Sequence, residues 1–183
     1  MTPEPNSAEW WDRLCRRYAD KGDDRDRPFE YEQIARTSRG SMLDIGCCFG
    51  ALLEYQSPLP YLGVDVSEFA IAEVRRRRPG GCIFLCGDAI QMTPLLRHCC
   101  DTVVAGQFIE HHNDPQETVR LLLRLPRRRL ILTVPRGPVQ NHQRENDGHR
   151  YGWADEDAVR ADFGDVTFFQ GASQHICWYQ DID

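Results

Sequence analysis

The chain has 183 residues, of which 41% are hydrophobic and 27% are charged, a balance that suits one globular domain and excludes a disordered chain. Its formal net charge of -6 argues against a general attraction to nucleic acid or to anionic membranes. No apolar run approaches the roughly 18 residues that cross a bilayer, and the N-terminus lacks a secretory pattern, so we expect a soluble cytoplasmic protein.

Two helices are predicted near the N-terminus, over residues 7–20 and 28–37. Trp10 and Leu14 repeat at helical spacing in the first segment. Pro28 suits the first position of the second helix. A polar linker joins the two segments, so we expect two separate helices in this region.

From residue 41 onward, short apolar runs alternate with amphipathic segments. This alternation is typical of a parallel sheet that helices cover on both faces. The predicted strands are 41–45, 61–66, 82–86, 101–105 and 130–134. The predicted helices between them are 50–56, 67–77, 93–98 and 114–125.

The C-terminal part has a different pattern. A helix is predicted near 155–162, followed by apolar runs at 166–170 and 175–180. Only a short Gly-Ala-Ser turn separates these two runs, so we expect them to pair antiparallel. The sequence therefore predicts an α/β fold with a doubly wound, seven-stranded sheet, mostly parallel with a C-terminal antiparallel strand, and helices on both faces.

The end of the first predicted strand reads Leu43-Asp44-Ile45-Gly46-Cys47-Cys48-Phe49-Gly50. Glycines let the backbone turn sharply and let a ligand approach it closely. In doubly wound sheets, ligands bind outside the carboxyl ends of the strands. The spacing D-x-G-x-x-x-G differs from the G-x-G-x-x-G of nicotinamide-binding proteins, so a nicotinamide oxidoreductase is disfavoured.

Acidic residues follow the next two predicted strands. Asp65 comes nineteen residues after Gly46, and a carboxylate at that strand end can accept hydrogen bonds from ribose hydroxyls. Alternatively, Asp65 or Ser67 caps the following helix. Asp88 could accept a hydrogen bond from an adenine amino group, or it could be a turn aspartate after glycine.

The fourth predicted strand is followed by Gln107-Phe108-Ile109-Glu110-His111-His112-Asn113-Asp114-Pro115. With the preceding landmarks, this order at successive strand ends resembles the class I S-adenosylmethionine-dependent methyltransferases over about residues 40–180. The resemblance implies a Rossmann-like fold, S-adenosylmethionine as cofactor and methyl transfer as the activity. It also implies the following boundaries: one methyltransferase domain over 1–183, N-terminal helices that form a lid over 1–38, and a cofactor-binding core over 40–183.

The resemblance also implies a set of cofactor contacts. By position, Gly46, Cys47, Cys48 and Gly50 would line the methionine part, Asp65 would hold the ribose, Val66, Asp88 and Ala89 would contact the adenine, Gln107 and Phe108 would lie beside the transferred methyl group, and Asp44 would order the glycine loop. The Cys47-Cys48-Phe49 run is bulkier than the small residues that this family often has there.

A sulfonium methyl group is already electrophilic, so the protein mainly has to align the acceptor and exclude water. A general base is needed only where the acceptor must lose a proton. The candidates are Glu110, His111, His112 and His149. Alternatively, Glu110 and His111 anchor the loop after the fourth strand and have a structural role.

Residues 136–153 form a long polar segment after the fifth predicted strand, and long loops at such a position are usually functional. With the N-terminal helices, this segment should cover the acceptor, and Tyr31, Tyr151 and Trp153 are candidates to line the acceptor pocket. The Ile109-Glu110-His111 run is similar to that of the broad quinone- and natural-product-modifying group. We therefore expect a small-molecule substrate. We expect no metal cofactor and no membrane association, and nucleic acid is not the favoured partner.

Two other functions remain open. Glu110, His111 and His149 also resemble three metal-binding positions of the small-RNA 3′-terminal 2′-O-methyltransferases, in which a divalent metal assists methylation. Gln107 replaces the carboxylate of the fourth position, which would weaken binding of a hard cation. A non-catalytic protein that binds the cofactor as a partner or sensor is the other alternative.

The chain has eight cysteines, and none forms a C-x-x-C pair, so we expect buried free thiols rather than a zinc site or disulfides. Cys82 and Cys86 fall in a predicted strand and should behave as small hydrophobic residues. Two arginine clusters, 75–78 and 127–129, are expected at a solvated helix end and in a loop before a strand. An RNA-backbone patch is the alternative.

Overall fold

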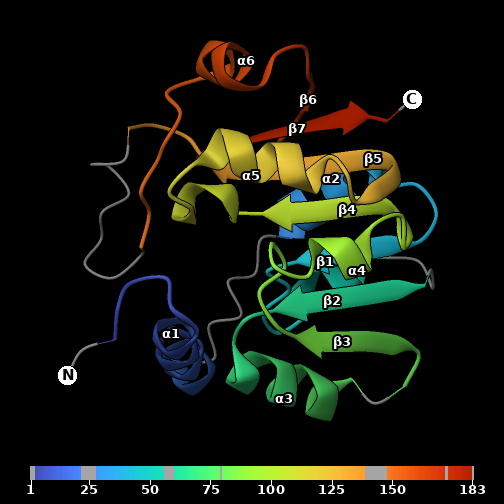
Figure 1. The fold of residues 1–183 in the computed structure, drawn as a ribbon, viewed down its shortest axis with the longest axis vertical. Helices are drawn as coiled ribbons and strands as arrows, with labels where there is room; N and C mark the ends of the chain where they lie inside the picture. The colour runs from blue at the N-terminus through green and yellow to red at the C-terminus, as the bar shows by residue number, and fades with distance from the viewer. Residues whose placement is uncertain are drawn as a thin grey trace.

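A computed structural model describes residues 3–21, 28–55, 60–78, 80–138, 148–171 and 173–182. They form a seven-stranded sheet in the order β3-β2-β1-β4-β5-β7-β6 (Figure 1). The strands are β1 (Met42–Ile45), β2 (Tyr61–Asp65), β3 (Cys82–Cys86), β4 (Cys100–Gly106), β5 (Pro126–Pro135), β6 (Thr167–Phe169) and β7 (His175–Asp181). The helices are α1 (Ala8–Lys21), α2 (Pro28–Thr37), η1 (Ala51–Tyr55), α3 (Glu68–Arg77), α4 (Thr93–Leu96), η2 (Ile109–His111), α5 (Pro115–Leu122) and α6 (Glu156–Phe163).

The strand directions confirm the predicted fold class. The first five strands pair with one another in parallel, and β7 pairs antiparallel with both β5 and β6. All four residues of β1 are buried, as is the run Leu130–Val134 in β5. Such continuously apolar strands are buried on both faces because helices cover both sides of the sheet.

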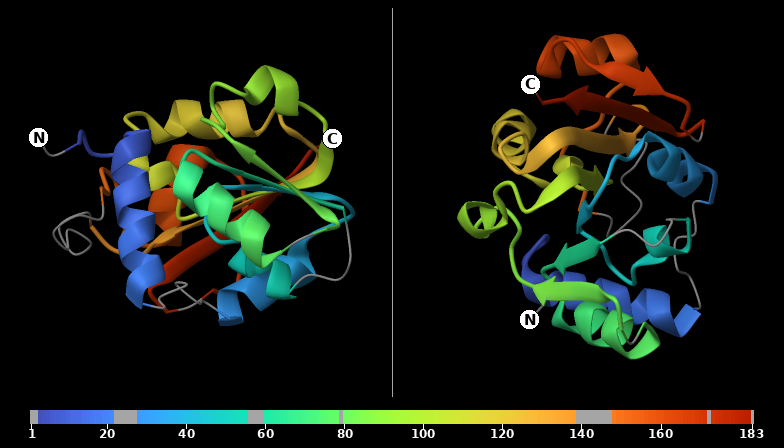
Figure 2. Two further views of the ribbon diagram at one scale, coloured as in Figure 1. Left: turned by 90° about the horizontal axis from the view of Figure 1, so that it is seen from below. Right: turned by 90° about the vertical axis from the view of Figure 1, so that its right-hand side faces the viewer.

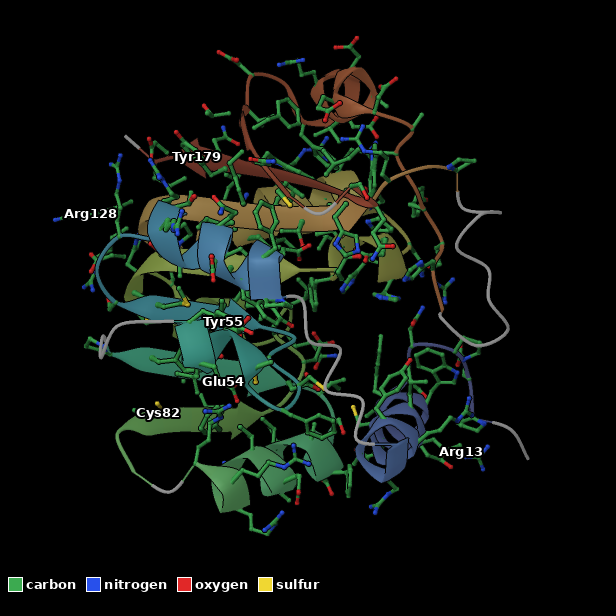
Figure 3. The ribbon with its side chains drawn as sticks, turned by 180° about the vertical axis from the view of Figure 1, so that it is seen from behind. Arg13, Glu54, Tyr55, Cys82, Arg128 and Tyr179 are labelled. Atoms are coloured by element: carbon green, nitrogen blue, oxygen red, sulfur yellow. The ribbon has the colours of Figure 1, made fainter. Side chains whose placement is uncertain are left out.

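Each face of the sheet has its own hydrophobic core. On one face, Val119 and Leu122 of α5 pack with Leu132 of β5 in the core that also takes in α4 and α6. On the other face, Ile34 of α2 and Ile71 of α3 belong to the second core. Figure 3 shows this second face, with α2 and η1 lying over the sheet. The helices of the two cores cover the faces of the sheet, and the ends of its strands stay uncovered by them.

Helix α1 lies across the edge at which the parallel strands end (Figure 2, left). Asp12 of α1 accepts hydrogen bonds from Ser67 Oγ at 2.5 Å and from the Phe69 backbone N–H at 3.1 Å. The Arg16 guanidinium lies 4.3 Å from the centroid of the Phe69 ring. The first helix is therefore held on the N-terminus of α3, beside the strand ends that the sequence marks as a ligand site.

Two expectations about the strands are wrong. Arg127–Arg129 were placed in a loop, but they lie within β5, because Pro126 already pairs with Cys100 of β4 and Arg129 pairs with Asp181 of β7. Cys86 was expected to be buried as a small hydrophobic residue, but it is exposed because β3 is an edge strand. The described cysteines are all free thiols, and four of them are buried.

None of the helices in the described part of the chain is long and apolar enough to cross a membrane.

Candidate active site

The glycine loop connects β1 to η1 at the carboxyl edge of the sheet. Its turn uses positive φ angles at Gly46 (72°), Cys48 (45°) and Gly50 (71°). A Cβ atom at Gly46 would lie 3.3 Å from the Phe108 ring, so a glycine keeps the backbone exposed here. Cys47 is 5% exposed and packs into the core on the α3 side, so its bulk does not fill the ligand side of the loop.

Cys48 is in contact with α1. Its Sγ lies 3.9 Å from Sγ of Cys15. Hydrogen bonding with Cys15 and burial raise the pKa of the Cys48 thiol, and burial raises the pKa of Cys47. These thiols are therefore neutral and weakly nucleophilic. Cys48 packs between α1 and the glycine loop, whereas Cys47 packs into the core.

Asp65 closes the glycine loop from the end of β2. One carboxylate oxygen accepts from the Cys48 backbone N–H at 2.9 Å, and the other accepts from the Ser67 N–H at 2.9 Å. Each carboxylate oxygen has a second lone pair, so these bonds leave Asp65 able to accept ribose hydroxyls as well. Burial raises the pKa of Asp65. Ser67 is the N-cap of α3, where its side chain accepts from the Ala70 N–H.

Asp44 lies beneath the loop rather than at its surface. It is 6% exposed, and the Tyr61 hydroxyl of β2 donates a hydrogen bond to its carboxylate. Burial and the nearby Asp44 charge raise the pKa of Tyr61. This bond joins the end of β1 to the start of β2. Ordering of the glycine loop by Asp44 stays a prediction.

The residues predicted at the adenine follow β2 and β3 at the same edge. Asp88 accepts hydrogen bonds from the Ile90 N–H at 2.8 Å and the Gln91 N–H at 3.3 Å, so the turn interpretation of Asp88 describes its local structure. Ala89 is buried and Val66 is half-buried. Contact of these residues with an adenine stays a prediction.

Gln107 and Phe108 follow β4 and complete this edge. Gln107 has a φ of 54°. Its backbone N–H donates to the Thr133 carbonyl at 2.8 Å, and its side-chain Nε2 donates to Thr133 Oγ1 at 3.2 Å. The Phe108 ring lies beside the His112 ring, with centroids 4.6 Å apart, and burial lowers the pKa of His112.

The structure brings Glu110, His111 and His149 together, as the sequence predicted. One ligand atom from each lies within 4.8 Å of the other two. Glu110 is fully buried, and His111 Nε2 lies 4.0 Å from its carboxylate. The His111 ring makes edge contacts with Trp11 and His149 at centroid distances of 4.9 and 4.7 Å.

Asn6 connects this cluster to the N-terminal segment. Its Nδ2 donates to the carbonyls of His111 and Gly148, both at 3.0 Å. A Cβ atom at Gly148 would meet Asn6 Oδ1 at 2.5 Å, so the close approach requires glycine there. The sequence analysis missed Asn6, because nothing in the local pattern shows which distant segment a single asparagine contacts.

One carboxylate and two imidazoles make a chemically plausible set of metal ligands. Imidazoles suit zinc, iron and other transition metals, whereas magnesium prefers an all-oxygen environment. The amide nitrogen of Gln107 donates to Thr133 Oγ1, and Gln107 supplies no carboxylate to the cluster. The arrangement therefore fits a borderline transition-metal ion better than a hard cation.

The sequence analysis also missed two further polar residues of this edge, Glu30 and His175. Glu30 of α2 is 1% exposed; Thr133 Oγ1 donates to its Oε1 at 2.9 Å, and His175 Nδ1 hydrogen bonds to its Oε2. A signal was present for Glu30, because it lies four residues before the apolar Ile34 of the predicted helix. A charge on the buried face of an amphipathic helix calls for a partner.

The three aromatic candidates for the acceptor pocket are separated in the structure. Tyr151 is 38% exposed, and its hydroxyl donates to the Asn113 carbonyl. Tyr31 packs against Tyr55, which Figure 3 labels on η1. Trp153 instead lies in the core, where it contacts Phe163 of α6. Residues 139–147 of the predicted lid, like 22–27 of the linker, lie outside the described residues.

Residues 43–131 match the family model of a methyltransferase domain. These residues belong to a methyltransferase domain, and the chain has the fold of the class I S-adenosylmethionine-dependent methyltransferases. S-adenosylmethionine is the methyl donor, and the exposed turn at Gly46 with the half-buried Asp65 carboxylate beside it fits such a cofactor. No curated protein sequence matches the chain.

Solved structures share the fold of this methyltransferase at low sequence identity. The N-methyltransferase NodS from Bradyrhizobium japonicum, bound to S-adenosylhomocysteine, is 18% identical with a TM-score of 0.68, over 93% of this chain and 97% of that chain. A protein of echinomycin biosynthesis is 18% identical with a TM-score of 0.65, over 96% and 93%. Magnesium protoporphyrin IX methyltransferase from Synechocystis is 16% identical with a TM-score of 0.58, over 96% and 84%.

Proposed function

We propose that this methyltransferase methylates a small-molecule acceptor. The observation that carries the proposal is the enclosure of the strand-end edge by the N-terminal segment. Asn6 bonds to the two loops that bear His111 and His149, and Asp12 bonds to the start of α3. An acceptor that reacts beneath this cover has to fit a site closed on both sides, which favours a small molecule.

The two arginine clusters, 75–78 and 127–129, give further support, because most of their described side chains form ion pairs within the chain. Arg76 and Arg77 pair with Glu73, and Arg78 pairs with Glu54. Arg129 is 5% exposed and pairs with Asp181. A surface that binds a nucleic acid backbone needs cations that are available to phosphates, so these clusters favour an acceptor other than RNA.

Similar structures are named for enzymes of small molecules, such as magnesium protoporphyrin IX methyltransferase. In this chain, Gly46, Gly50 and Asp65 would hold the cofactor, and the bound cofactor supplies an electrophilic methyl group. Glu110, His111 and His149 would face the acceptor and orient it. We further propose that the chain acts as one domain, with residues 1–38 as the lid, in the cytoplasm.

The test begins with binding of S-adenosylhomocysteine, measured by calorimetry. The protein is then incubated with S-adenosylmethionine carrying a labelled methyl group and a cell extract separated into small-molecule, protein and RNA fractions. We expect label in the small-molecule fraction, and none with Asp65→Ala at a cofactor concentration that saturates only the wild type. Label found only in protein or RNA would contradict the proposal.

A second candidate function is metal-assisted 2′-O-methylation of RNA, favoured by the gathering of Glu110, His111 and His149. It predicts that a divalent transition-metal ion stimulates transfer to RNA more than Mg²⁺ does, and that a chelator abolishes the transfer. Methylation of a small molecule at full rate in the presence of a chelator would exclude this candidate.

A further inference from the structure

A buried polar cluster lies on the α2 face of the sheet, next to the carboxyl end of β5. It consists of Glu30 in the first turn of α2, Thr133 near the end of β5 and His175 at the start of β7; we call it the Glu30 cluster. Glu30 is 1% exposed, Thr133 is fully buried and the His175 side chain is 10% exposed. Three segments that are distant in sequence therefore place polar side chains at one point of the core.

Both carboxylate oxygens of Glu30 have a partner within the cluster. Thr133 Oγ1 donates to Oε1 at 2.9 Å, and Oε2 forms a hydrogen bond with Nδ1 of His175. Burying a carboxylate is unfavourable unless it is paired and hydrogen bonded. An apolar residue at this position would stabilise the core more than a carboxylate does. A hydrogen-bonded carboxylate–imidazole pair at the carboxyl edge of the sheet therefore suggests a role in the reaction.

The cluster is joined to the residue predicted beside the transferred methyl group. Gln107 Nε2 donates to Thr133 Oγ1 at 3.2 Å, so Thr133 contacts both Gln107 and Glu30. His175 is paired with Pro135, and the next residue along β5, Arg136, donates its N–H to the Gln174 carbonyl. The imidazole therefore lies where the predicted acceptor loop leaves the sheet.

We propose that His175 is the general base of methyl transfer and that Glu30 is the residue that positions it. Glu30 accepts from Nδ1, which fixes the proton on that nitrogen and leaves Nε2 as the basic atom. By comparison, His111 Nε2 lies 4.0 Å from Glu110, beyond hydrogen-bonding distance. The proposal rests on the proposed function and narrows it to acceptors that must lose a proton, such as hydroxyl or amine groups.

The proposed step balances without a further reactant. An electron pair of the acceptor oxygen or nitrogen forms a bond to the methyl carbon, while the carbon–sulfur bond breaks and its electron pair stays on sulfur. The proton that the acceptor loses passes to Nε2 of His175. The Glu30 carboxylate then stabilises the imidazolium until solvent removes the proton.

The first test reads the protonation of His175 directly and needs no acceptor. Protein labelled with ¹⁵N-histidine is studied by ¹H–¹⁵N nuclear magnetic resonance at neutral pH, and the His175→Gln spectrum assigns the signal. We expect a neutral ring with the proton on Nδ1 in the wild type, and a mixture of the two neutral forms in Glu30→Gln. A ring protonated on Nε2, alone or together with Nδ1, could not accept a proton at Nε2 and would overturn the proposal.

The second test separates chemistry from binding, with the acceptor fraction that the labelling experiment identifies. His175→Gln should lower kcat by about 100-fold or more, the usual contribution of a general base, with the Kd of S-adenosylhomocysteine unchanged within about twofold. His98→Asn is the matched control, since His98 is exposed beyond the opposite ends of the strands. Equal losses of kcat and cofactor affinity, or no loss at all, would contradict a base; failure of the wild type to bind the cofactor would refute the proposed function instead.

Discussion

Asp65 combines two tasks at the end of β2. Its carboxylate holds the glycine loop through the Cys48 N–H, and it is predicted to accept the ribose hydroxyls. Asp65→Ala should weaken binding of S-adenosylhomocysteine by about 1.5–3 kcal/mol, the range for hydrogen bonds to a charged group. Calorimetric titration measures the loss, with Asp114→Ala as the control, because Asp114 caps α5. An unchanged affinity would refute the ribose assignment.

Cys99 is the thiol that we expect to react first. Hydrogen bonding with Cys100, 3.8 Å away, lowers its pKa to about 7, whereas burial raises the pKa of the more exposed Cys86. Because the thiolate is the nucleophile, iodoacetamide at neutral pH should label Cys99 before Cys86. Peptide mapping by mass spectrometry gives the order, and earlier labelling of Cys86 would show that exposure dominates.

The local structure of the candidate site was predictable from sequence, whereas its long-range contacts were not. Gly46 lies in a turn and Asp65 ends a strand, as predicted, because both patterns are recognisable within a few residues; their cofactor contacts stay predictions. Glu30 and His175 are 145 residues apart, and their contact depends on how α2 packs across β5 and β7. Asn6 was missed for the same reason.

At the scale of elements, α1 is held on the core by Asp12. The carboxylate accepts two hydrogen bonds at the N-terminus of α3, so Asp12→Ala should destabilise α1 docking by about 1.5 kcal/mol. That corresponds to roughly tenfold faster amide exchange in α1 where exchange follows local opening. Hydrogen–deuterium exchange checks this, with Arg13→Ala as the control because Arg13 is exposed on the same helix (Figure 3). Equal protection in both variants would show that other contacts hold α1.

Most elements were predicted within two or three residues, because apolar runs and helical spacing are local properties. One exception is the short helix η2, which was not predicted. Another is β5, which was expected to begin at Leu130 and begins at Pro126. Three consecutive arginines do not look like a strand. The strand includes them because Pro126 pairs with Cys100 of β4 and Arg129 pairs with Asp181 of β7, contacts that the local sequence does not encode.

For the whole molecule, Arg129 joins β5 to β7 and to the end of α2. It donates two hydrogen bonds to Asp181 at 2.7 and 2.9 Å and one to the Thr37 carbonyl at 2.8 Å. Arg129→Leu should lower the free energy of unfolding by about 2 kcal/mol, less than for a fully buried pair because Asp181 is half-exposed. Urea denaturation measures the change, and Arg128→Leu, an exposed neighbour, should change it little. Equal effects of the two substitutions would contradict this role.

The same pair predicts a dependence on pH. Hydrogen bonding to Arg129 lowers the pKa of Asp181 below that of an unfolded aspartate. A lowered folded pKa contributes stability that is present above the unfolded value of about 3.9 and is lost as pH falls through the folded value. The difference between wild type and Arg129→Leu should therefore shrink in acid. Denaturation curves at neutral and acidic pH test this, and a difference that grows in acid would contradict it.

Positive φ angles have a consequence for the balance between stability and activity. Four described non-glycine residues have them, and three of these, Asn6, Cys48 and Gln107, border the proposed site. A left-handed backbone costs an L-residue about 1–2 kcal/mol, so the site stores conformational strain that the rest of the fold has to tolerate. Replacing Gln107 with glycine would release that strain while removing its amide. The enzyme should therefore be easy to make more stable at these positions, and each such gain should come with slower methyl transfer.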